Sequence, residues 1–135
     1  MKTNRNSLII LLVFLFSSIT FSAQFSDREI NEMMVDVANE YARNLPQVID
    51  AETTVIGIIA GGNRDIIYKY QLSNMEKNDP GFSLFVSLVR RKHINNFCTQ
   101  PMLEIYRKEN ITMAHNFVDW RGNYLFELRI NNSYC

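Results

Sequence analysis

The fold is constrained most by the order in which helix-like and strand-like spacings of apolar residues follow one another along the chain. Apolar residues recur every three or four positions from Ile30 to Leu45, as on one face of an amphipathic helix. Ser26 and Glu29 form a capping-box pattern before this segment, and Pro46 ends it. The segment before Pro46 therefore predicts one long helix.

Two strands are predicted after this helix. Residues 53–60 are rich in β-branched side chains, and residues 66–72 alternate between two faces of a strand. Gly61, Gly62 and Asn63 lie between them and tolerate the positive φ angles of a tight reversal. We therefore expect a β-hairpin.

The second half of the chain repeats this order of elements. Residues 82–97 have the apolar spacing of a helix, and a short helix is expected within residues 100–108. Alternating residues at 111–117 and 124–130 flank a turn at 119–123, which predicts a second hairpin. The expected fold class is α+β, with a four-stranded antiparallel sheet from two hairpins and two main helices on one face, in the order α-β-β-α-β-β.

Residues 1–23 are typical of a signal peptide. Lys2 and Arg5 precede an unbroken apolar stretch, and small residues follow it up to Ala23. The apolar stretch is much shorter than the roughly 20 residues that span a bilayer. We expect cleavage after Ala23, a periplasmic or secreted location, and a single α+β domain over residues 24–135 with no stable membrane insertion.

Cys98 and Cys135 are the only cysteines in the chain. In an oxidising compartment an even number of cysteines predicts a disulfide, and this one would hold the end of the chain. A reactive thiol is the alternative, although no C-x-x-C spacing supports it. No metal or cofactor motif accompanies the two cysteines, so no cofactor is expected.

The charge balance argues against nucleic acid as a partner. Removal of Lys2 and Arg5 with the leader leaves two more acidic than basic residues in the remaining chain. Binding to nucleic acid depends mainly on neutralising phosphates with basic side chains, which an acidic balance disfavours. The expected partner is a protein of the cell envelope.

No catalytic motif is found in the sequence. His93 falls on the apolar face of the second predicted helix, and His115 falls within a predicted strand. Both positions are typical of packed histidines, and no nucleophile is placed beside either of them by the sequence. An enzyme is therefore the less favoured reading, and it would need a site assembled from His93 or His115.

Four residues are candidates for partner binding. Trp120 and Arg121 occupy the tip of the second predicted hairpin, and both residue types are enriched at binding hot spots. Arg90 and Arg91 form part of a basic run on the second predicted helix. The alternatives are that Trp120 packs over the sheet edge and that the arginines are a solvated helix end.

The outer face of the predicted sheet offers a second possible binding surface. Ile67, Val118 and Leu125 are expected there among polar residues, and an open sheet also has edges that can accept a partner strand. These features, like the four candidate residues, favour binding over catalysis.

The chain from Leu45 onward resembles small exported bacterial proteins of unassigned function. The shared pattern includes Leu45-Pro46 before a strand with a Y-x-Y sequence, then Asn96, Cys98 and Thr99, and a final hairpin that ends in Cys135. Some proteins of this build resemble pilotins, periplasmic helpers that escort an outer-membrane secretion channel. The resemblance implies a non-enzymatic protein-binding role in the cell envelope and carries over no functional residue.

Three functions therefore follow from the sequence. The leading hypothesis is a non-enzymatic exported protein-binding module of the bacterial cell envelope. The alternatives are a secreted or periplasmic inhibitor of the immunity type, which would use the polar loop at residues 73–81, and a small hydrolase.

Overall fold

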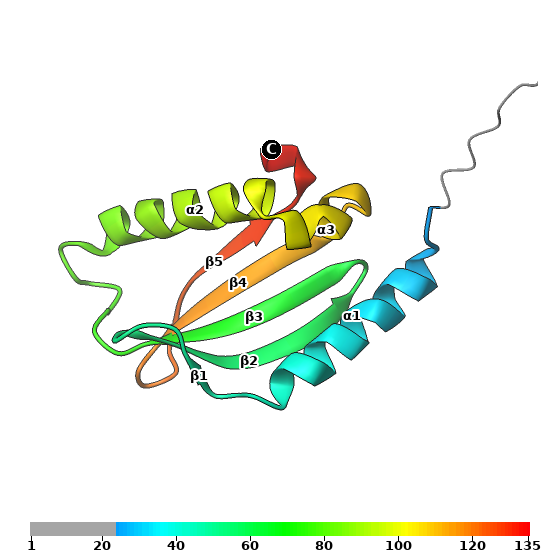
Figure 1. Cartoon of the computed structure of the whole chain (residues 1–135). Helices are drawn as coiled ribbons and strands as arrows, with labels where there is room; N and C mark the ends of the chain where they lie inside the picture. The colour runs from blue at the N-terminus through cyan, green and yellow to red at the C-terminus, as the bar shows by residue number, and fades with distance from the viewer. Residues whose placement is uncertain (1–23) are drawn as a thin grey trace, which may run out of the picture.

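The computed structural model describes residues 24–135, so the predicted signal peptide and its cleavage site lie outside the described residues (Figure 1). The described chain is an α+β domain with three α-helices and a five-stranded mixed sheet. In chain order, its elements are α1 (Asp27–Ala42), β1 (Gln47–Val48), β2 (Thr53–Gly62), β3 (Asp65–Leu72), α2 (Phe82–Thr99), η1 (Pro101–Leu103), α3 (Glu104–Lys108), β4 (Thr112–Asp119), β5 (Tyr124–Ile130) and η2 (Asn132–Tyr134).

The expected α+β class is confirmed, but the four-stranded antiparallel sheet is wrong. The strand order is β1-β2-β3-β4-β5, and β3 pairs with β4 in parallel, from Asp65 opposite Thr112 to Leu72 opposite Asp119. The reason is the connection between them, because a long crossover that contains α2 returns the chain to the same end of the sheet. The two expected hairpins are present, and they are joined side by side through this parallel pair.

The short strand β1 was not expected from the sequence. Gln47 and Val48 pair with Val55 and Thr54 at the edge of the sheet, and both are exposed. A strand of two residues has no visible period, so only the pairing with β2 reveals it.

Helix α1 begins and packs as its sequence pattern predicts. The Ser26 side chain accepts a hydrogen bond from the Glu29 amide, and the Glu29 carboxylate accepts one from the Ser26 amide, which completes the capping box. Ile30, Met34 and Ala38 are buried on one face of the helix and belong to the core. In Figure 1 the helix lies along β2, with which it makes most of its contacts.

The reversal between β2 and β3 lies slightly later than expected. Strand β2 continues through Gly62, and the turn is made by Asn63 and Arg64, which have φ angles of 48° and 60°. Two successive residues with positive φ are characteristic of the tight turns that match the twist of a hairpin.

Helix α2 lies over β5 and ends at the disulfide (Figure 1). Cys98, in its last turn, is bonded to Cys135, with a Cα–Cα distance of 5.4 Å, as the sequence predicts. The bond attaches the residues after β5 to the end of α2. Two leucines of the helix, Leu84 and Leu88, are exposed on its outer side.

The outer face of the sheet exposes fewer apolar side chains than expected. Val118 is buried rather than exposed, because β4 is an interior strand whose neighbours on both sides cover it. Leu125 lies at a register shift between β4 and β5 and joins the core. Only Ile67 of the three predicted residues remains partly exposed. Within residues 24–135, none of the helices has the length and apolar character needed to cross a membrane.

Candidate functional site

A cleft between α2, the sheet and the loop before β2 is the candidate functional site. Its volume is about 410 Å³, a size that suits a small ligand or part of a peptide. Five side chains at positions 85, 89, 92, 93 and 96 come from one face of α2. The other walls are Tyr70, Phe117 and Thr53 of the sheet and the loop residues Ile49 and Asp50.

Aromatic side chains form the inner surface of this cleft. The rings of Tyr70 and Phe117 are stacked with their centroids 4.7 Å apart, on the paired strands β3 and β4. Phe117 stacks in turn on Phe126 of β5, against which Phe85 of α2 packs edge-on. This continuous set of rings gives the cleft a rigid, apolar wall.

The two histidines lie together at the base of the cleft. The ring centroids of His93 and His115 are 4.1 Å apart, and the Tyr70 hydroxyl lies 3.0 Å from Nδ1 of His115. His93 lines the cleft, whereas His115 is buried behind it. The sequence predicted each histidine as a packed residue but gave no sign that the two would meet.

Burial controls the ionisation of this cluster. It lowers the pKa of His93 to about 4, with a smaller contribution from the Lys92 charge, and lowers the pKa of His115 to about 3, with a contribution from His93. Burial also raises the pKa of the Tyr70 hydroxyl far above its usual value. At neutral pH both imidazoles are therefore uncharged, and Tyr70 keeps its proton.

These ionisation states make the cluster a poor catalytic centre. A general base works best when its pKa is near the working pH, and both histidines fall well below it. The hydroxyls that line the cleft belong to Thr53 and Tyr70, and Tyr70 is held as a phenol.

The rim of the cleft carries a carboxylate on one wall and an ammonium and an amide group on the other. The Asp50 carboxylate accepts a hydrogen bond from the Glu52 amide, which is the main cause of its lowered pKa, and the Lys92 charge lowers it further. Lys92 and Asn96 lie one turn apart on α2, at the opposite wall. The rim can therefore accept a hydrogen bond on one side and donate on the other.

The four predicted partner-binding residues do not line this cleft. Trp120 is exposed at the turn between β4 and β5, and the Arg121 guanidinium lies 4.5 Å from the centre of its ring. Arg90 and Arg91 line a more open depression beside the disulfide, together with Tyr134 and Cys135. The two pairs thus occupy different parts of the surface, and their role in binding stays a prediction.

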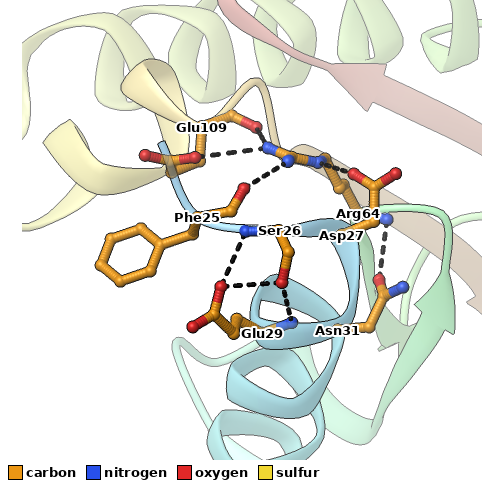
Figure 2. Close-up of polar contacts among 7 residues, drawn as sticks. All are labelled: Phe25, Ser26, Asp27, Glu29, Asn31, Arg64 and Glu109. Atoms are coloured by element: carbon orange, nitrogen blue, oxygen red, sulfur yellow. Dashed lines mark hydrogen bonds and ion pairs between the residues drawn. The ribbon is translucent and has the colours of Figure 1, made fainter. Parts of the chain in front are cut away.

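Arg64 organises a second polar cluster, which the sequence did not reveal (Figure 2). Its Nε donates to Asp27 at 2.7 Å and its Nη2 to the Phe25 carbonyl at 3.1 Å, at the start of α1. Its Nη1 donates to the carbonyl of Glu109, whose carboxylate is 3.4 Å away, and its amide donates to Asn31 at 3.0 Å. A single arginine in a hairpin turn has no pattern that predicts such contacts.

The contacts of Arg64 hold separate parts of the fold together. It joins the first residues of the described chain and the hairpin turn to the end of α3, as Figure 2 shows. All five donors of a guanidinium can be used in such a fork, which a lysine could not reproduce. At the same place the Arg64 carbonyl accepts a hydrogen bond from the Thr112 amide, where Thr112 pairs with Asp65 at the end of the sheet.

Comparison with known proteins shows which of them share this small α+β fold. No family model matches the chain, and no curated protein matches it. Among solved structures, the chain is similar to a candidate secreted protein from Pseudomonas aeruginosa, with a TM-score of 0.68 and 16% identity over 81% of this chain and 95% of that one.

Two pilotins share this fold. The pilotin of the Vibrio vulnificus type 2 secretion system has a TM-score of 0.64 and 13% identity, and that of the Vibrio cholerae type II secretion system has a TM-score of 0.63 and 14% identity. Each alignment covers 81% of this chain and 94% of the pilotin. The predicted likeness to pilotins is thereby confirmed at the level of the fold.

Proposed function

We propose that residues 24–135 are a non-enzymatic protein-binding module of the bacterial cell envelope, periplasmic or secreted after removal of residues 1–23. The observation that carries this proposal is the open cleft with an aromatic wall and a polar rim, in a fold shared with two pilotins. Such a combination of apolar surface and a few polar groups is typical of binding sites.

The chemistry of the cleft supports binding over the two alternatives. A hydrolase would need a base that is effective near neutral pH, and the low pKa values of His93 and His115 disfavour one here. An inhibitor of the immunity type was expected to present a protruding loop at residues 73–81. In that loop most side chains are exposed, Met75 packs against the core, and the Asp79 carboxylate accepts a hydrogen bond from the Glu76 amide. No contact in this loop specifically favours an inhibitor.

Cross-linking in the native cell envelope tests the proposal. The tagged chain with its disulfide intact would be cross-linked in cells, purified and analysed by mass spectrometry. One envelope protein recovered in near-equal amount, and absent from a control with an unrelated tagged periplasmic domain, is the expected result. Repeated recovery of the chain alone, together with turnover of a small substrate, would overturn it.

A further inference from the structure

The rim of the cleft carries polar side chains that are open to solvent. Lys92, His93 and Asn96 line the cleft; Lys92 is exposed, and His93 and Asn96 are partly exposed. Polar groups at such a place hydrogen-bond to water or to a ligand. These three are therefore available to a bound molecule.

The charges at the rim limit what that molecule can be. Asp50 is ionised, and its carboxylate faces the same cleft as the Lys92 ammonium. A ligand with a single carboxylate would gain from Lys92 and lose to Asp50, so the rim gives it no net attraction. A neutral group with a donor on one side and an acceptor on the other fits both walls, and a peptide unit is such a group.

The interior of the cleft sets the second requirement. Phe85 and Val89 are partly exposed and contribute apolar surface, and the buried rings of Tyr70 and Phe117 lie behind them. A large apolar side chain, aromatic above all, would stack or pack there as a single buried group.

We propose that the cleft binds one large apolar side chain of a partner segment, whose adjoining peptide unit donates to Asp50 and accepts from Lys92 and Asn96. This inference rests on the proposed function and deepens it, because it names the part of the partner that is recognised. The partner segment is extended at this point, since its backbone donor and acceptor must be free of a helix.

The test uses the purified chain with its disulfide and a defined probe, N-acetyl-L-phenylalaninamide, followed by amide NMR shifts. Saturable shifts at residues 85–96 and at Phe117 are expected, with weaker or no binding of N-acetylglycinamide and of phenylacetate. Val89→Trp, which fills the cleft, should weaken binding by about tenfold or more. Leu88→Trp is the matched control, because Leu88 is on the same helix, exposed and outside the cleft, and binding should be unchanged.

Two surface variants keep the test decisive if Val89→Trp does not fold. Lys92→Ala and Asp50→Asn change exposed groups, and each should weaken binding of the probe several-fold. Absence of saturable shifts in the folded protein, or equal losses in Leu88→Trp, would overturn the inference. Tighter binding of free phenylalanine than of the amide would also overturn it, in favour of an amino-acid site. Capture of an envelope partner that Val89→Trp leaves unchanged would keep the proposed function and remove this site.

Discussion

The imidazole rings of His93, on α2, and His115, on β4, lie with their centroids 4.1 Å apart. The Tyr70 hydroxyl, on the neighbouring strand, is hydrogen-bonded to Nδ1 of His115, and the Tyr70 ring packs edge-on against His93. The contact joins the helix to the two central strands at the base of the cleft. It depends on both rings being uncharged, because two imidazolium ions at this distance would repel each other.

Stability should fall as the pH decreases through the histidine range. The unfolded chain binds protons near the usual histidine pKa of 6.5, whereas folded His93 and His115 do so only near 4 and 3. Between these values the unfolded state holds more protons, so the free energy of unfolding decreases by up to about 1.4 kcal/mol per pH unit for each group. Urea unfolding from about pH 7 to pH 4 measures this slope.

His93→Gln provides the control for this dependence. The variant removes one of the two titrating rings, so its stability should change less steeply with pH over the same range. The other ionisable groups near the pair are Tyr68 and Tyr70 on β3, Lys92 on α2 and Asp50 in the loop. An unchanged slope in the variant would show that these groups, or others, control the acid sensitivity.

Replacing Arg64 with methionine should destabilise the domain by about 2 kcal/mol, because the partly buried guanidinium donates to several groups at once. Arg28→Met is the matched control, since Arg28 pairs only with exposed Glu32 and should change stability by less than about 0.5 kcal/mol. Chemical denaturation of both variants checks the prediction. Equal effects would mean that the contacts in Figure 2 add nothing beyond a surface ion pair.

Loss of the disulfide should lower stability by up to about 4 kcal/mol, as expected for closing a loop between residues separated by 37 positions. The double variant Cys98→Ser/Cys135→Ser removes the bond without leaving a free thiol. Its unfolding free energy, compared with that of the oxidised protein, gives the contribution. Intact mass before and after reduction should differ by two hydrogen atoms, and two free thiols in protein from its native compartment would contradict the bond.

Trp120→Ala should change stability by less than about 1 kcal/mol, because the ring is half exposed and its main contact is the stacked Arg121. If Trp120 contributes to partner binding, cross-linked recovery of the envelope partner should decrease in the variant. A thermal melt and the cross-linking experiment measure the two effects separately. A large loss of stability with unchanged recovery would assign Trp120 to packing.

Local features of the fold were predictable because they are coded over short distances. The capping box of Ser26 and Glu29 is visible in four consecutive residues and is present as expected. The apolar period that follows it places Ile30, Met34 and Ala38 in the core. The Cys98–Cys135 bond followed from cysteine number and compartment alone.

Long-range relationships were not predictable from these patterns. Hydrophobic alternation in β3 and β4 shows that both are strands, but the same alternation occurs in parallel and antiparallel pairs. The meeting of His93 and His115 depends on that pairing and on where α2 crosses it. The contacts of Arg64 likewise join three segments that are distant in the sequence.

The parallel pairing of β3 with β4 also affects how the chain can assemble when its N-terminal part is made first. During synthesis the first hairpin and α1 are made before β4, which completes the centre of the sheet. Until β4 arrives, side chains such as Ile66 and Tyr70 lack the strand beside them and remain open to water or to other unfinished chains. Exposed apolar surface and an unpaired strand edge of this kind make an incomplete domain prone to aggregation.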